Sequence, residues 1–222
     1  MVTNADCKER MKDADAVRAM AAKLGEAFSS ERMPGAQWCL HGGTALSAYL
    51  GRDNPEGGVV LPGDNDIDIA ILAETISPAW LTEAFDDVGF RRGYFFHDKL
   101  FPQVGVVLRF FWDGVPVDLY WLYKRGRKRW WVTAPRVAHV LPAYLFERLG
   151  TAKFLGVEMP SPDPLEAYVY CKWKKVGDRF PGKSQGGECL DFDYEWPIYD
   201  DQAAFREAYA RRVGTSYLTE CR

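Results

Sequence analysis

The sequence has few cysteines, no long hydrophobic run and no large excess of charge of either sign. Its five cysteines are odd in number, far apart and without a C-x-x-C spacing, which argues against a disulfide framework and against a thiolate zinc site. We therefore expect buried free thiols. No stretch approaches the roughly 20 consecutive apolar residues that cross a bilayer, so no membrane span is expected.

The N-terminal residues bear on the location of the protein, its net charge bears on the partners, and its length bears on the number of domains. Residues 1–10 are polar and lack the apolar segment of a secretory signal peptide, so a cytoplasmic location is the default expectation. Lys and Arg number 28 against 31 Asp and Glu, a net charge of −3, whereas proteins dedicated to duplex binding usually carry a basic excess. Nucleic acid is therefore not an expected partner. The 222 residues predict one domain over 1–222, with a helical segment at 1–36 and an aromatic loop and helix at 178–222.

Hydrophobic periodicity and turn residues predict an α/β (α+β) chain in which helices and strands are interspersed. Ser77 and Pro78 are typical of a helix start, and Gly89 of the following helix end. The expected helices cover 12–28, 45–50, 78–88, 163–175 and 201–213, and the expected strands cover 38–40, 66–72, 104–112, 115–123 and 129–132.

The segment Asp64-Asn-Asp66-Ile-Asp68-Ile-Ala-Ile71 carries the most chemical information. Successive side chains of a strand point to opposite faces, so Asp66 and Asp68 share one face, and the intervening isoleucines share the other and can be buried. Asp64 joins the carboxylate face if the strand extends that far. Neighbouring carboxylates raise one another's pKa, and a divalent cation with oxygen ligands is the usual way to neutralise them. A solvated acidic strand end is the alternative.

A second strand pair supplies a third carboxylate. Asp113-Gly114 between two alternating runs predicts a two-residue hairpin turn. Counting back from this turn places Arg109 opposite Asp118, which is an acid within an apolar run. An unpaired charge there would be costly, so Asp118 should meet either a metal ion or a cation. A cross-strand ion pair with Arg109 is the structural alternative.

Glycines and basic residues offer candidate anion contacts. His41-Gly42-Gly43-Thr44 follows a strand and opens a helix, where two glycines permit close approach and helix-start N–H groups favour an anion. The basic run from Lys124 to Arg129 and the late-helix Lys172 each allow two interpretations, a solvated surface or contact with a diphosphate or an anionic acceptor.

The order of these features resembles the nucleotidyltransferase superfamily and, in detail, the LicD/fukutin family. That family carries a G-T motif, then P-x-D-x-D-I-D, then an apolar strand with a single Asp. The resemblance covers roughly residues 38–176 and departs at Asn65 and in a longer loop over 51–61. The matching segments are Gly43-Thr44, Pro62–Asp68, Pro116–Leu119, Phe154–Pro160 and Pro164–Tyr168.

The resemblance implies a nucleotidyltransferase-like mixed sheet flanked by helices, with the Asp-Gly hairpin carrying the third carboxylate, and dependence on Mg²⁺ or Mn²⁺. Members move phosphocholine or a polyol phosphate from a CDP-activated donor to a hydroxyl acceptor, usually a sugar or glycan, and release CMP. By position, Asp66 and Asp68 would be metal ligands, Asp118 a third ligand or base, and Asp64 a supporting ligand. The donor's diphosphate would be held by Gly42, Gly43 and Thr44, with His41, Arg109 and Lys172 as further candidate contacts.

Two other functions stay open. Residues 40–46 also look like the opening of nucleotidyltransferase toxins, which would attack the α-phosphate of an NTP and modify RNA, protein or a small molecule. The other alternative is a non-catalytic binding module that retains the fold.

Overall fold

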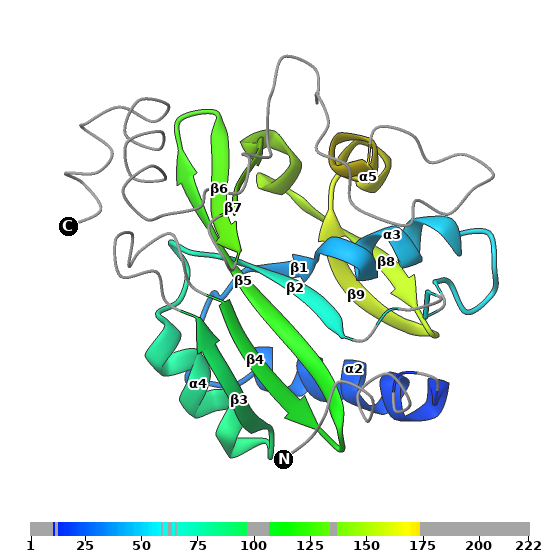
Figure 1. Cartoon of the computed structure of the whole chain (residues 1–222), viewed down its shortest axis with the longest axis vertical. Coiled ribbons are helices and arrows are strands. Elements are labelled where there is room, and N and C mark those ends of the chain that lie inside the picture. The colour runs from blue at the N-terminus through cyan, green and yellow to red at the C-terminus, as the bar shows by residue number, and fades with distance from the viewer. Residues whose placement is uncertain are drawn as a thin grey trace.

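The computed structural model describes residues 11, 13–58, 60–61, 64, 66–96, 107–133 and 137–173. Over these residues the chain is mixed α/β, with four α-helices and a mixed sheet (Figure 1). The aromatic loop and helix expected at 178–222 lie outside the described residues. None of the helices in the described part is long and apolar enough to cross a membrane.

The principal sheet has the strand order β1-β2-β5-β4-β3. Strands β2 and β5 pair in parallel, while β1 with β2, β4 with β5 and β3 with β4 pair antiparallel. The far half of β5 pairs with β6, which pairs with β7, and β8 and β9 form a separate two-stranded hairpin. The strands are β1 Trp38–Leu40, β2 Ile67–Leu72, β3 Arg91–Phe96, β4 Val107–Trp112, β5 Val115–Arg125, β6 Lys128–Thr133, β7 Val137–Pro142, β8 Leu149–Phe154 and β9 Val157–Pro162.

Two of the helices begin at a side-chain cap. The Asp13 carboxylate caps the first of them by accepting from the Ala16 N–H, and the Ser77 hydroxyl caps another by accepting from the Trp80 N–H. The residue after that helix's C-cap, Gly89, has φ +90°, as expected for a glycine that ends a helix. The helices are α2 Ala14–Phe28, α3 Gly42–Leu50, α4 Pro78–Asp87 and α5 Leu165–Trp173, with a 3₁₀ turn η1 at Ala143–Phe146.

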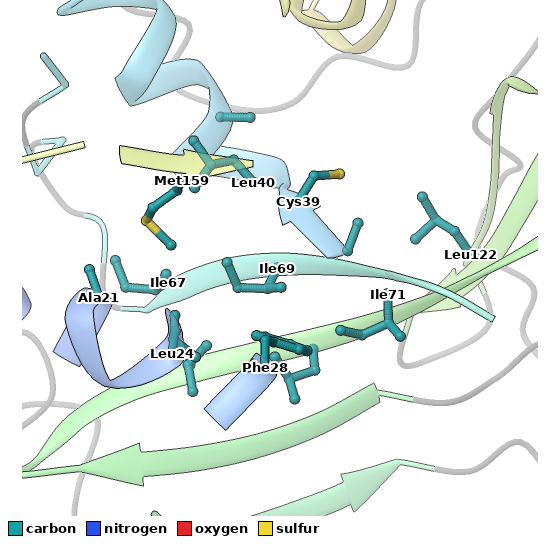
Figure 2. Packing of buried hydrophobic residues seen from close by; sticks show 14 of the residues in the cluster. Ala21, Leu24, Phe28, Cys39, Leu40, Ile67, Ile69, Ile71, Leu122 and Met159 are labelled. Atoms are coloured by element: carbon teal, nitrogen blue, oxygen red, sulfur yellow. The ribbon is translucent and has the colours of Figure 1, made fainter. Parts of the chain in front are cut away.

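The alternation expected for β2 is confirmed. Ile67, Ile69 and Ile71 are at most 1% exposed, and in Figure 2 these side chains extend toward Leu24 and Phe28 of α2. The apolar face of β2 is thereby closed by α2, and the carboxylates occupy the opposite face.

The hairpin is confirmed in every pairing. Asp113 and Gly114 have φ +46° and +80°, the two left-handed residues that a type I′ turn needs. Arg109 lies opposite Asp118 in the register of β4 and β5, and Trp112 lies opposite Val115.

Two expectations are corrected, and one open question is narrowed. The helix expected at 45–50 begins earlier, at Gly42, since the glycine pair forms its first turn. Of the two interpretations left open for the basic run, a solvated surface does not describe Arg129, because its side chain is 3% exposed and pairs with Glu74. Cys171 is disulfide-bonded, whereas Cys39 is a free, buried thiol; cysteine count and spacing do not show which thiols meet in space.

Candidate active site

Carboxylates from two strands converge on one face of the sheet. Asp68 of β2 and Asp118 of β5 are register partners in the parallel pairing, so their side chains leave the sheet on the same side. Asp66 immediately precedes β2, and its carboxylate, like that of Asp118, accepts a hydrogen bond from Arg109. The convergence expected of Asp66, Asp68 and Asp118 is therefore present.

The guanidinium of Arg109 bridges the carboxylates of Asp118 and Asp66. Its Nε donates to Asp118 Oδ1 at 2.5 Å and its Nη2 to Asp118 Oδ2 at 2.6 Å, and the same Nη2 also donates to Asp66 Oδ2. The three side chains are largely shielded, with exposed fractions of 13% for Arg109, 17% for Asp66 and 4% for Asp118. The ion pair expected across the hairpin therefore exists, and it extends to the second strand.

The glycine pair brings the start of α3 against the acids. Gly43 N–H donates to Asp68 Oδ2 at 2.8 Å. A Cβ on Gly42, whose φ is +46°, would lie 2.0 Å from Asp68 Oδ2, and one on Gly43 would lie 3.0 Å from Asp64 Oδ2. Only glycine at position 42 leaves room for the Asp68 carboxylate, and Gly43 brings Asp64 to the same place.

Two further contacts fix Asp68 through its backbone. Its N–H donates to the Thr44 hydroxyl at 2.8 Å, and its carbonyl accepts from the His41 N–H at 3.0 Å. Thr44 is 1% exposed, so in this structure its hydroxyl serves β2 and is shielded from a ligand. The segment from His41 to Thr44 thus holds the acidic strand in position.

Burial and mutual repulsion perturb the acids. Burial, followed by the charge of Asp118, raises the pKa of Asp66 to about 7 despite the opposing effect of Arg109. Burial, followed by the charges of Asp66 and Asp64, raises the pKa of Asp68 well above its usual value. One guanidinium does not balance this group of acids, so the cluster can accept further positive charge.

A tyrosine that the sequence analysis assigned no role supports the glycine pair from behind. The Tyr168 hydroxyl accepts from Gly42 N–H at 2.9 Å and lies 2.9 Å from His41 Nδ1. Burial lowers the pKa of His41 well below its usual value, so the ring is neutral and hydrogen-bonds the tyrosine hydroxyl through Nδ1. Tyr168 entered the sequence analysis only as the last residue of a matching segment, and no charge or spacing marks its contact with Gly42.

Lys172 and His41 belong to a buried aromatic cluster next to this contact. Lys172 is 6% exposed, and its Nζ lies 5.0 Å from the centre of the Trp131 ring. The His41 ring meets Trp131 edge-on, with ring centres 4.8 Å apart. The charge of Lys172 also lowers the pKa of His41, so these two predicted phosphate contacts lie close to each other and beneath the surface.

The basic residues at the tip of β5 and β6 lie far from the acids. Arg125, at the end of β5, is seven residues beyond Asp118, or about 23 Å in an extended strand. The basic run at this tip is therefore remote from the acids. Pro62, Gly63 and Asn65 lie outside the described residues.

The donor set fits a hard divalent cation. Asp64, Asp66, Asp68 and Asp118 offer carboxylate oxygens, which Mg²⁺ and Mn²⁺ prefer. In the part of the chain that is described, no three His, Cys, Asp or Glu side chains stand close enough to hold a metal ion. The Arg109 guanidinium lies between Asp66 and Asp118.

Comparison with models of known protein families finds no match, and comparison with curated proteins finds no relative. The resemblance drawn from the motifs therefore stays a prediction.

Proposed function

We propose that this protein is a divalent-metal-dependent transferase that moves a phosphorylated head group, such as phosphocholine or a polyol phosphate, from a CDP-activated donor to a hydroxyl of a sugar or glycan. One observation carries the proposal. Carboxylates of two neighbouring strands meet at a helix start whose glycines leave room for them. Phosphoryl transfer needs charge neutralisation and positioning more than it needs an elaborate nucleophile.

Asp66 and Asp68 are the residues that would hold Mg²⁺ or Mn²⁺, with Asp64 in support. They supply oxygen ligands on one face, and burial, followed by repulsion from neighbouring acids, raises the pKa values of both. A bound cation would supply neutralisation of the diphosphate and a lowered pKa for the attacking hydroxyl.

Gly42, Gly43 and Thr44 shape this site by contacts within the chain. The two glycine N–H groups donate to Tyr168 and Asp68, and the threonine hydroxyl accepts from a backbone N–H. Their proposed contribution is to hold the carboxylates where the diphosphate arrives.

The proposed reaction balances without a covalent enzyme intermediate. The acceptor oxygen forms a bond to the distal phosphorus, and the bond from that phosphorus to the bridging oxygen breaks. The electron pair leaves with CMP, and the acceptor proton passes to a carboxylate of the cluster.

The test is transfer from CDP-choline and from CDP-ribitol to sugar acceptors with Mg²⁺, following CMP release. Asp66→Asn and Asp68→Asn should each lower turnover by at least about 100-fold, while Asp15→Asn, a change at an exposed acid on α2, should leave it unchanged. Turnover that survives both site substitutions within about twofold contradicts the proposal.

The same assay separates the alternatives. Pyrophosphate release from an NTP, with the nucleotide appearing on RNA, protein or a small molecule, indicates nucleotidyl transfer, which the same acids would serve. Binding of donor and metal without any product indicates a binding module.

A further inference from the structure

We propose that Arg109 is a positioning residue that anchors Asp118 and competes with the divalent cation for Asp66. The inference rests on the proposed function, because it concerns the metal that this function needs. In the metal-free protein the guanidinium bridges the two carboxylates. When the metal binds, Arg109 gives up Asp66 and keeps Asp118.

The contacts of Arg109 are unequal in a way that makes this exchange possible. Asp118 receives two hydrogen bonds, one from Nε and one from Nη2, and such a forked pair is the strongest geometry an arginine makes with a carboxylate. Asp66 receives only one, from the Nη2 that already serves Asp118. Loss of the Asp66 contact therefore leaves the forked pair complete.

The backbone reinforces the same inequality. Arg109 and Asp118 are cross-strand partners in a hairpin closed by a two-residue turn, so their relative position is fixed by local pairing. Asp66 lies on a bend before β2, outside the β2–β5 ladder that begins at Ile67. Of the two carboxylates, Asp66 is the one whose side chain can turn to a new partner without breaking a strand pair.

Charge favours the exchange as well. With Arg109 assigned to Asp118, Asp66 and Asp68 remain to hold a dication, with Asp64 at the same helix start. The Asp68 carboxylate accepts from the Gly43 N–H and not from Arg109, so it is a ligand that the arginine does not contest. Asp66 is the contested one, and its release sets the apparent affinity for metal.

The experiment is titration of the chelator-treated, full-length protein with Mn²⁺ by isothermal calorimetry, which needs no substrate. Arg109→Gln removes the competing charge, and we expect its dissociation constant for Mn²⁺ to fall at least tenfold below that of the wild type. The matched control is Arg129→Gln. Arg129 is a second buried arginine that makes a forked pair, and its partner Glu74 follows the other end of β2. This control variant should bind Mn²⁺ with wild-type affinity. Equal or weaker binding by folded Arg109→Gln overturns the inference alone, whereas no Mn²⁺ binding by either the wild type or Arg109→Gln overturns both the inference and the proposed function.

A measurement on the wild type covers the case in which Arg109→Gln does not fold. The arginine Nε–H signal in ¹⁵N NMR, assigned by its absence from Arg109→Lys, should stay protected from solvent exchange on saturation with Mg²⁺. The Nη signals of the same residue should shift or exchange faster. Loss of Nε–H protection, or no change in any Arg109 signal at saturation, overturns the inference.

Discussion

Replacing Gly42 with alanine tests whether the start of α3 needs a glycine to accommodate the Asp68 carboxylate. The glycine has φ +46°, and a Cβ there would lie 2.0 Å from Asp68 Oδ2 and 2.6 Å from its Cγ. The clash is with the whole Asp68 side chain, including its Cβ at 2.9 Å, so the carboxylate has to move. When it moves, it loses the hydrogen bond from Gly43 N–H.

The expected cost has two parts. A non-glycine residue in left-handed backbone costs about 1–2 kcal/mol, and leaving the Gly43 N–H without its acceptor costs about 1–3 kcal/mol. Gly42→Ala should therefore destabilise the fold by about 2–5 kcal/mol. It should also weaken Mn²⁺ binding, because Asp68 no longer faces the other acids.

Gly35→Ala is the matched control, because Gly35 has φ +76° and a Cβ there would meet no atom within 4 Å. It should cost only the backbone strain, about 1–2 kcal/mol, and leave Mn²⁺ binding unchanged. Urea unfolding gives both free energies and calorimetry gives both affinities. The reasoning is refuted if the two variants lose the same stability and Gly42→Ala binds Mn²⁺ as the wild type does.

Three further predictions concern stability. The pKa of Asp66 is raised to about 7, so above about pH 4 the folded state retains a proton that the unfolded state has released. The metal-free protein should therefore lose stability between about pH 4 and about pH 7. Asp66→Asn should flatten this slope in thermal denaturation, and an unchanged slope would count against the assignment. Tyr168→Phe removes the hydroxyl that accepts from Gly42 N–H and should cost about 1–3 kcal/mol in urea unfolding, with no loss telling against that contact. Glu74→Gln leaves the buried Arg129 charge without its forked partner and should lower the free energy of unfolding in urea by about 2 kcal/mol. The loss should be smaller than for a fully buried pair, because the Glu74 side chain is 47% exposed. Unchanged stability would contradict the pairing.

The features that sequence predicts well are local ones. The turn at Asp113-Gly114 fixes the hairpin register by itself, so the Arg109–Asp118 pairing could be counted from the turn. Alternation along β2 likewise placed Asp66 and Asp68 opposite the buried isoleucines. In each case the information lies within about ten residues of chain.

The features that sequence missed depend on distant segments. Nothing in residues 66–72 shows that β2 pairs in parallel with β5 and puts Asp68 beside Asp118. The contact of Arg109 with Asp66 follows only from that pairing. The Tyr168 contact with Gly42 joins residues 126 positions apart, and no periodicity signals it. Strands β3, β7, β8 and β9 were not assigned either, because their sequences lack clear alternation.

The position of Arg109 follows from how the parallel pair is connected. A parallel pair needs a long crossover, and here the crossover from β2 to β5 contains α4, β3 and β4. Pairing β2 with β5 brings Asp68 against Asp118, and this repulsion opposes closure of the crossover. Strand β4 belongs to this crossover and pairs with β5, so the crossover places Arg109 beside Asp118 and Asp66, where the acids of β2 and β5 meet. The compensating charge is thus tied to the same topology that creates the repulsion.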